Sequence, residues 1–353
     1  MIPLTSDTET KPTYAMRQAM AAAEVGDEQK GEDPTVNLLL DRVADLLGKE
    51  AALFFPTGTM CNLVSVKVHT RPADAVFADH MAHVIRAESG GAAFCSGVLI
   101  EPITTERGIF TPEEVDQAIA RVATAPSPYS PIARLVCVEQ THNFGGGSVW
   151  TLDELRAVCY HARSRGLATH MDGARLMNAS VAAGTPAQDF AACVDSVWID
   201  FTKGLGAPLG AVLAGAKEFI SEARRYKHIF GGALRQAGVV AAACIYALDN
   251  HVDRLQEDHD NAKRLARGLS EIEGIQVRTI APESNILFFD VSGLGLDNGT
   301  FLRLLYERGV KMGAVGGCIR AVTHIDVSRN DVEKAISAVA EIARGTCVGK
   351  SGR

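Results

Sequence analysis

One lysine stands where a surface lysine has little purpose. Lys203 follows a stretch rich in apolar residues (194–201) and precedes a turn that contains Gly204, Gly206 and Pro208. The apolar stretch predicts a short buried strand, and the small residues after it let other groups approach closely. Because burial lowers the pKa of an ammonium group, a lysine in such a place is suited to form an imine with a carbonyl. On this segment alone, a lysine in a solvated loop is the alternative.

Asp172 ends the predicted strand that precedes Lys203 in the chain. Ligands in open α/β sheets bind at the carboxyl ends of the strands, which is where this side chain falls. A carboxylate beside a pyridine nitrogen keeps that nitrogen protonated, so the ring can accept the electrons of a bond that breaks at Cα. The alternative is that Asp172 caps the helix expected to begin near Ala174.

A third group of residues predicts a phosphate site. Thr57, Gly58 and Thr59 lie between a predicted strand (51–55) and a predicted helix (60–68). Free backbone N–H groups and the positive end of the helix can bind a phosphate there, although many short glycine turns are only turns. Phosphate cradle, aspartate and lysine, in this order, are the contacts that pyridoxal 5'-phosphate needs.

The composition is that of a soluble globular protein. Of the 353 residues, 47% are hydrophobic and 22% are charged, and the net charge of -7 disfavours nucleic acid or an anionic membrane as a partner. Neither a signal peptide nor a membrane span is recognisable, so we expect a cytoplasmic protein. The eight cysteines lie mostly in apolar stretches and never as CxxC, which favours reduced thiols over disulfides or a metal site.

Strand and helix patterns alternate over much of the chain, which predicts an α/β fold with a mostly parallel sheet covered by helices. We expect an N-terminal arm (1–33), a large α/β domain (34–250), a small C-terminal α+β domain (251–345) and a disordered tail (346–353). Arms of this kind often complete a neighbouring subunit. The expected strands of the large domain are 51–55, 75–77, 98–102, 134–138, 167–170, 196–201 and 210–213. The expected helices include 15–23, 34–47, 60–68, 112–122, 152–165, 174–183, 232–248 and 251–272.

In combination, these residues and several further motifs resemble the threonine aldolases, which are fold type I (aspartate aminotransferase-like) pyridoxal-phosphate enzymes. The resemblance extends from Ser6 to about Ser328. It implies a large domain with a mostly parallel seven-stranded sheet, and retro-aldol cleavage of a β-hydroxy-α-amino acid, typically threonine, into glycine and an aldehyde. It also implies a homo-oligomer, with a dimer as the smallest active unit and a tetramer expected. Matching motifs include Gly31-Glu32-Asp33-Pro34-Thr35-Val36-Asn37, Pro56-Thr57-Gly58-Thr59-Met60, Glu88-Ser89-Gly90-Gly91, Glu139-Gln140-Thr141-His142-Asn143, Asp172-Gly173-Ala174-Arg175 and Lys203-Gly204-Leu205-Gly206-Ala207-Pro208.

The resemblance assigns the cofactor contacts. Lys203 resembles the lysine that binds the cofactor aldehyde, and Asp172 resembles the partner of the pyridine nitrogen. Arg235 resembles an arginine that reaches the cofactor phosphate of a neighbouring subunit. The further residues that resemble cofactor binders are Gly58, Thr59, His83, Arg175 and Thr202, the last in a place usually held by serine.

The resemblance also assigns the substrate contacts. Ser6, Arg175 and Arg320 resemble the set that holds the substrate carboxylate. The planar fork of an arginine fits a carboxylate and fixes which bond at Cα stands perpendicular to the cofactor ring. As alternatives, Arg320 is a surface residue of a strand, and Arg175 pairs with an acid on its own helix.

Two histidines match family positions near the substrate hydroxyl. His83 resembles the histidine that stacks on the cofactor ring, and His142 matches a second histidine at the hydroxyl end. Cleavage of the Cα–Cβ bond requires removal of the hydroxyl proton, and histidine is a base of suitable pKa. Each of the two is otherwise a hydrogen-bonded structural histidine. Glu88 and Glu139 match motif positions without an assigned role.

Two residues depart from the family pattern. Lys30 stands where relatives commonly have tyrosine, and Asp200 adds a carboxylate to a strand that is usually less charged. Both leave the preferred aldehyde and the threo/erythro selectivity open. Whether a bound ion assists the reaction is open as well. Two other functions remain: a β-eliminating lyase that uses the same cofactor on an amino acid with a leaving group at Cβ, and a non-catalytic cofactor-binding relative.

Overall fold

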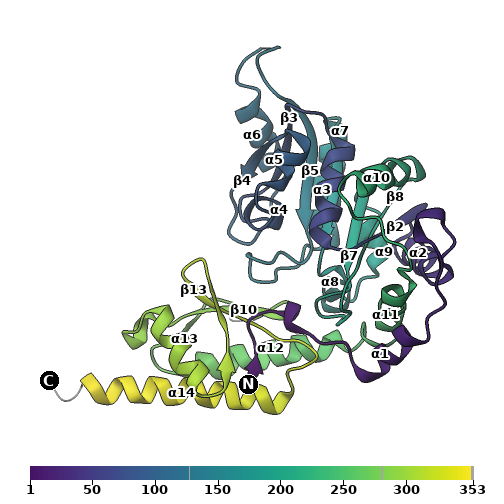
Figure 1. Cartoon of the computed structure of the whole chain (residues 1–353). Coiled ribbons are helices and arrows are strands. Elements are labelled where there is room, and N and C mark those ends of the chain that lie inside the picture. Colours follow the sequence, from purple (N-terminus) through teal and green to yellow (C-terminus); the bar gives the residue numbers. More distant parts are fainter. Residues whose placement is uncertain (127, 280, 351–353) are drawn as a thin grey trace. The chain divides into compact units, whose positions relative to one another are not determined.

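The computed structural model describes residues 1–126, 128–279 and 281–350 (Figure 1). The chain divides into two compact units, one formed by Pro12–Val252 and the other by Met1–Lys11 together with Asp253–Arg353. The start of the chain thus belongs with the C-terminal unit, whereas the sequence predicts one continuous arm over 1–33. The reason is that the start of the chain pairs with a strand of the C-terminal unit: β1 (Ile2–Pro3) runs parallel to β11 (Val310–Lys311).

The larger unit is built on a seven-stranded sheet in the order β2-β8-β7-β6-β5-β3-β4. The pairs from β7 to β4 are parallel, and β8 is antiparallel to both of its neighbours. This confirms the predicted mostly parallel sheet. The strands are β2 (Ala51–Phe55), β3 (Asp74–Asp79), β4 (Leu99–Ile103), β5 (Ile132–Glu139), β6 (Ala168–Gly173), β7 (Ser196–Asp200) and β8 (Ala211–Gly215).

Helices cover both faces of this sheet, since every residue of β7 and β8 is buried. One hydrophobic cluster joins Leu53 and Leu213 of the sheet to Val64 of α3 and Ala223 of α10. The helices of the larger unit are α1 (Tyr14–Ala21), α2 (Pro34–Leu47), α3 (Gly58–His69), α4 (His83–Arg86), α5 (Gly91–Ser96), α6 (Pro112–Val122), α7 (Leu152–Ser164), α8 (Leu176–Ala183), α9 (Ala187–Ala191), α10 (Lys217–Ile229) and α11 (Gly238–Asn250), with a 3-10 turn at Glu28–Lys30.

Among the described residues, four helices were not anticipated, namely α4, α5, α9 and α10, and another helix begins later than expected. The sequence pattern gives no helix at α10, although Ile220 and Ala223 form a buried stripe there. The helix expected from residue 232 begins only at Gly238. The preceding loop is held elsewhere, because the backbone N–H of Leu234 donates to Glu28 Oε2 at 3.3 Å.

The smaller unit has an antiparallel sheet in the order β12-β13-β10-β9 and its own hydrophobic core. Its elements are α12 (Leu255–Ser270), β9 (Gln276–Val277), β10 (Ile286–Asp290), α13 (Asn298–Glu307), β12 (Gly313–Val315), β13 (Cys318–Val322) and α14 (Arg329–Lys350), with short 3-10 turns at Asp7–Glu9 and Ser292–Leu294. The tail expected to be disordered over 346–353 is instead helical as far as Lys350, and residues 351–353 lie outside the described residues. In the described part of the chain, every helix is too short or too polar to cross a lipid bilayer.

Candidate active site

Three parallel strands of the larger unit end with polar or aromatic side chains beside one another. Glu139 of β5 is in register with Asp172 of β6, and Asp172 is in register with Trp198 of β7. Two residues earlier on β6 and β7, and therefore on the same face, His170 is in register with Ser196. Because side chains alternate along a strand, residues that share a register position point to the same face. The strand pairing therefore places two layers of side chains on one face of the sheet: Glu139, Asp172 and Trp198 form one layer, and His170 and Ser196 form the next, toward the amino end of β7.

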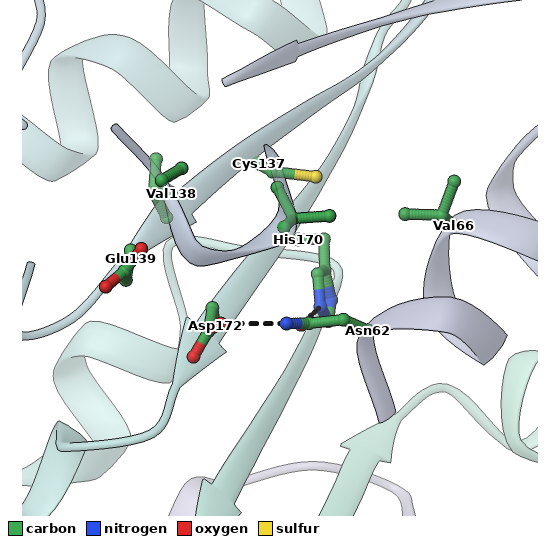
Figure 2. Close-up of a pocket in the computed structure, with 9 residues that line it drawn as sticks. Asn62, Val66, Cys137, Val138, Glu139, His170 and Asp172 are labelled. Carbon is green, nitrogen blue, oxygen red and sulfur yellow. Dashed lines mark hydrogen bonds between the residues drawn. The ribbon is translucent and has the colours of Figure 1, made fainter. Parts of the chain in front are cut away.

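Asp172 lies at the centre of this edge and is only 6% exposed. Its Oδ2 accepts a hydrogen bond from Asn62 Nδ2 at 2.8 Å, and Figure 2 shows both residues in the wall of one pocket. Its Oδ1 accepts from the backbone N–H of Ala174 at 3.0 Å, so the capping alternative describes part of its bonding. Burial, together with the negative charge of Glu139, raises the pKa of Asp172 to about 6. A cation beside this carboxyl group would favour its ionised form.

Lys203 follows β7 and is enclosed rather than solvated. Its Nζ lies 2.8 Å from Asp200 Oδ2 and 5.7 Å from the centre of the Trp198 ring, and its side chain is 16% exposed. This environment excludes the solvated-loop alternative. Asp200 Oδ1 accepts from both the backbone N–H and the hydroxyl of Thr202, each at 2.8 Å. Asp200, which departs from the family pattern, therefore holds both neighbouring residues that the sequence assigns to the cofactor.

His83 begins α4 and lies between two buried carboxylates. Its backbone N–H donates to Glu139 Oε2 at 2.7 Å, and its ring Nδ1 lies 2.8 Å from Glu88 Oε1. Burial acts to lower the pKa of His83, but the hydrogen bond to Glu88 and the charges of Asp172, Glu88 and Glu139 outweigh it and raise the pKa. Because Glu88 engages Nδ1 as an N–H donor, Nε2 is the nitrogen that can accept a proton. Glu88 and Glu139, which had no assigned role, thus fix the ring and the backbone of His83.

His142 lies in a far more enclosed place than His83, with 1% exposure. Its Nδ1 accepts from the backbone N–H of Gly145 at 2.9 Å, and its Nε2 lies 3.2 Å from Asp79 Oδ1. Burial opposes charging, but the carboxylates of Glu139 and Asp79 raise the pKa of His142. Both ring nitrogens are turned toward protein groups, Nδ1 in a hydrogen bond and Nε2 in an ion-pair contact, which favours a structural function for this histidine over contact with a substrate.

The expected phosphate turn forms the start of α3. Thr57 caps the helix, and its hydroxyl accepts from the backbone N–H of Met60 at 3.2 Å. Gly58 and Thr59 follow as the first helical residues, where backbone N–H groups have no partner within the helix. A Cβ atom on Gly58 would lie 2.2 Å from the Trp198 ring, so only glycine fits beside this ring. The turn therefore has the free N–H groups that an anion site requires, and its backbone approaches the Trp198 ring closely.

The arginines expected at the site lie in three different settings. Arg175 is buried at the start of α8, and its Nη1 lies 3.4 Å from Asn143 Oδ1 in the loop after β5. Arg320 is in the smaller unit, where its Nη2 donates to Thr5 O at 3.1 Å, next to Ser6. Arg235 is exposed in the larger unit and pairs with Asp27 at 3.0 Å. Lys30 lies 3.9 Å from the same Asp27 carboxylate.

Sequence reasoning did not single out several side chains that organise the site. Asn62 connects Asp172 and Glu88, and Trp198 contacts Gly58, Asn62 and Lys203. His170 also contacts Asn62, with its Nε2 3.1 Å from Asn62 Oδ1. The available signal was an isolated asparagine in the otherwise apolar run Met60-Cys61-Asn62-Leu63-Val64.

The same cluster has the composition of a cation site. One ligand atom from each of His83, Glu88 and Asp172 lies within 4.8 Å of the others. Glu88 Oε1 and Asp172 Oδ2 nevertheless both accept hydrogen bonds from Asn62 Nδ2. A cation at these oxygens would displace those donors, so the arrangement favours a hydrogen-bonded network.

The chain matches the family model of beta-eliminating lyases over residues 3–292. The chain belongs to the beta-eliminating lyase family. Within the family it is similar to proteins named low-specificity L-threonine aldolases. It is 40% identical to that of Escherichia coli (strain K12) over 333 residues, which cover 94% of this chain and 96% of the relative. It is 39% identical to low-specificity L-threonine aldolase 1 of Arabidopsis thaliana, which covers 95% of this chain and 94% of the relative.

Solved structures show the same fold. The threonine aldolase of Leishmania major aligns with a TM-score of 0.82 at 22% identity and covers 97% of this chain and 100% of its own. A protein of Listeria monocytogenes described as a putative L-allo-threonine aldolase aligns with a TM-score of 0.78 at 20% identity, with 97% of this chain and 96% of that chain covered. This family member thus has the fold type I architecture that the sequence motifs predict.

Proposed function

We propose that this chain is a pyridoxal-phosphate-dependent aldolase that cleaves L-threonine, L-allo-threonine or a related β-hydroxy-α-amino acid to glycine and an aldehyde. The observation that carries the proposal is the combination of an enclosed Lys203, a buried Asp172 and a carboxylate-held His83 at the ends of the parallel strands. The similarity of about 40% to proteins named low-specificity L-threonine aldolases over nearly the whole chain supports the substrate class.

The residues present fit the cofactor. The turn at Gly58 and Thr59 offers free N–H groups to a phosphate, and the glycine leaves room that a Cβ atom would fill. Asp172 is a buried carboxylate with a raised pKa, which a protonated pyridine nitrogen would match. Lys203 supplies the primary amine for covalent attachment. When bound, the cofactor would act as the acceptor of the electron pair that leaves the Cα–Cβ bond.

His83 is the base that the geometry favours for the β-hydroxyl proton. Its Nδ1 faces Glu88, which sets the tautomer and leaves Nε2 as the proton acceptor. Its side chain is 33% exposed, whereas His142 is enclosed and has both nitrogens engaged. His83 must be neutral to accept a proton, and because its pKa is raised, the neutral form requires a higher pH than it does in an ordinary histidine. His142 then serves to hold the loop after β5, because its Nδ1 accepts from the backbone N–H of Gly145.

Substrate orientation requires a cation for the carboxylate group. Arg175 offers a buried guanidinium beside the loop after β5, and Ser6 and Arg320 offer a hydroxyl and a second guanidinium in the smaller unit. We assign Arg175 to the substrate carboxylate, because a planar guanidinium can bind both oxygens and fix the rotation about the Cα bonds. For Ser6 and Arg320, the same task is what the family resemblance implies.

The runner-up is a β-eliminating lyase, which the name of the matched family favours. The two reactions remove different protons: the aldolase needs a base at the β-hydroxyl group, and the lyase needs one at Cα. Incubation of the purified protein with threonine and with phenylserine distinguishes them. The aldolase releases glycine and an aldehyde from both, and the lyase releases neither product. A panel of threo and erythro β-hydroxy amino acids then gives the preferred substituent.

We further propose a homo-oligomer in which Arg235 reaches a neighbouring subunit. The exposed guanidinium forms an ion pair with the half-buried Asp27, and ion pairs of exposed side chains are weak, so a stronger anion can replace that partner. Light scattering of the eluted protein measures the assembly. Arg235→Ala should weaken cofactor binding without unfolding the subunit.

A further inference from the structure

Asn62 occupies an unusual position for an asparagine. It lies on the face of α3 that packs against the sheet, four residues after Gly58, and it is 1% exposed. Residues four apart on a helix lie one above the other. The helix that begins with the phosphate turn therefore places this amide beside Asp172 of β6 and Trp198 of β7.

The orientation of the amide is fixed by a group that can only donate. Trp198 Nε1 lies 2.7 Å from Asn62 Oδ1, and an indole N–H has no acceptor function. The oxygen of the amide must therefore face Trp198, and the nitrogen must face the opposite side. His170 Nε2 also lies 3.1 Å from Oδ1, which fills the second lone pair of this oxygen.

The nitrogen of the amide joins the two carboxylates of the site. Asn62 Nδ2 donates to Asp172 Oδ2 at 2.8 Å and to Glu88 Oε1 at 2.7 Å. The same Glu88 oxygen faces His83 Nδ1 at 2.8 Å. Two negative charges are thus separated and held by the two hydrogens of one neutral group. All four hydrogen-bonding positions of Asn62 are used, which leaves the side chain no second arrangement of equal energy.

A chain of hydrogen bonds between neutral side chains ends at the oxygen of the amide. Since His170 donates from Nε2 to Asn62, its Nδ1 must accept from the hydroxyl of Ser196 at 2.8 Å. The oxygen of Ser196 then accepts from His69 Nε2, also at 2.8 Å. Burial lowers the pKa of His170 to about 3 and that of His69 to about 4, so both rings stay neutral at the pH of catalysis. Every donor in this chain points toward Asn62. Figure 2 shows Asn62 together with His170 and Asp172, two of its partners.

We propose that Asn62 is a positioning residue that holds the carboxylates of Asp172 and Glu88 in place with one amide group, and that through them it sets both the partner of the cofactor ring and the tautomer of His83. The assignment of these two tasks rests on the proposed function. The hydrogen-bonded bridge itself belongs to the chain alone, so it can be measured in protein from which any cofactor has been removed.

The test is a carboxyl titration of the cofactor-free protein. Aspartate is labelled with 13C at the carboxyl carbon, and the signal of Asp172 is identified by its loss in Asp172→Asn. Asn62→Leu removes both N–H donors at similar volume. Since a hydrogen bond to a charged group favours the ionised form, we expect the midpoint of Asp172 to rise by about one to two pH units in this variant. Asn62→Ser, which keeps one hydroxyl donor in less volume, should give a smaller rise.

A matched control separates the bridge from general loss of a buried amide. Asn261 of α12 is also buried in a helix, and its Nδ2 donates to Val327 O at 3.1 Å within the smaller unit. Asn261→Leu should leave the titration of Asp172 unchanged. Pyridoxal phosphate binding, followed by absorbance, should weaken about ten-fold or more in Asn62→Leu and remain unchanged in Asn261→Leu, by the same loss of charged hydrogen bonds.

The outcomes distinguish this inference from the proposed function. A raised midpoint in folded Asn62→Leu supports the bridge even if the wild-type protein fails to bind pyridoxal phosphate, a failure that would count only against the proposed function. An unchanged midpoint in a folded variant overturns the bridge even if the wild type cleaves threonine. If Asn62→Leu does not fold, as judged by near-ultraviolet circular dichroism, the titration of Asn62→Ser decides in the same way.

Discussion

Asp200 Oδ2 lies 2.8 Å from Lys203 Nζ, so the amine assigned to the cofactor already has an anionic partner in the protein. The other oxygen of Asp200 binds Thr202 twice. This arrangement gives Lys203 a defined place whenever its amine is not attached to another molecule. Asp200 is thus connected to the site by direct contacts, although the sequence shows it only as a departure from the family pattern.

Removal of the Asp200 carboxylate should slow turnover. We expect Asp200→Ala to reduce kcat about ten-fold, because a hydrogen bond to a charged group contributes about 1.5 kcal/mol or more. Asp200→Asn should lose less, since its amide oxygen can still accept from Lys203. Steady-state kinetics with threonine measure both. Asp195→Asn is the control, because Asp195 also accepts from a threonine N–H and hydroxyl, those of Thr169, outside the site. Equal rates in wild type and Asp200→Ala would contradict this function.

The pH dependence should follow His83. Its pKa is raised above the ordinary value of 6.5, and the neutral ring is the active form, so kcat/KM should fall as the pH drops through the raised value. Glu88→Gln removes the negative charge that favours the protonated ring. The acid limb should then move to lower pH by about one unit. Glu114→Gln, in the capping box of α6, is the control and should not move it. A limb that stays in place or moves to higher pH in Glu88→Gln would exclude His83 as the base.

Asp172 should cost stability in the cofactor-free protein above about pH 6. Its folded pKa of about 6 exceeds the ordinary value of 3.8, so the folded state binds a proton more tightly than the unfolded state does. Stability from this group is present below the unfolded pKa and is lost as the pH rises through the folded pKa. Asp172→Asn imitates the protonated form. The change in melting temperature caused by this substitution should therefore be more favourable at pH 8 than at pH 4. The same variant should bind pyridoxal phosphate far more weakly. A pH-independent difference would contradict the raised pKa.

Gly58 should not tolerate a side chain. A Cβ atom would lie 2.2 Å from the Trp198 ring, and this ring is itself buried. We expect Gly58→Ala to lose about 1–3 kcal/mol of stability in urea unfolding, the usual cost of overpacking, and to bind phosphate-bearing cofactor poorly. Gly345→Ala is the control, because no atom lies within 4 Å of its Cβ position. Adding Trp198→Phe to Gly58→Ala should restore part of the stability, and failure to do so would locate the clash elsewhere.

The sequence predicts the parts of the site that depend on residue type at the end of a strand. Lys203, Asp172 and the turn at Gly58 are recognisable because a reactive amine, a carboxylate and a glycine follow apolar stretches in the right order. Asn62, His170 and Ser196 are not recognisable in this way. Their function comes from the register of β6 with β7 and from the face that α3 turns to the sheet, and both are set by the packing of distant segments.

The longest of the helices that the sequence pattern missed, α10, has a similar explanation. Lys227 lies on the buried side of α10, with its Nζ 2.6 Å from Glu28 Oε1 and the side chain 1% exposed. A charge on the apolar stripe hides the period of 3.6 residues that normally reveals a helix. The partner that makes this burial tolerable, Glu28, lies 199 residues away in the sequence. The pair is therefore visible only in the folded chain.

The central claim is that Lys203 holds the cofactor covalently. The most direct measurement is to reduce the cofactor-loaded protein with borohydride, digest it and determine the masses of the peptides by mass spectrometry. The account predicts the added mass of a phosphopyridoxyl group on the peptide that contains Lys203, and no such mass in Lys203→Ala treated in the same way. Modification of another lysine, or a wild-type protein that stays unmodified after saturation with pyridoxal phosphate, would contradict it.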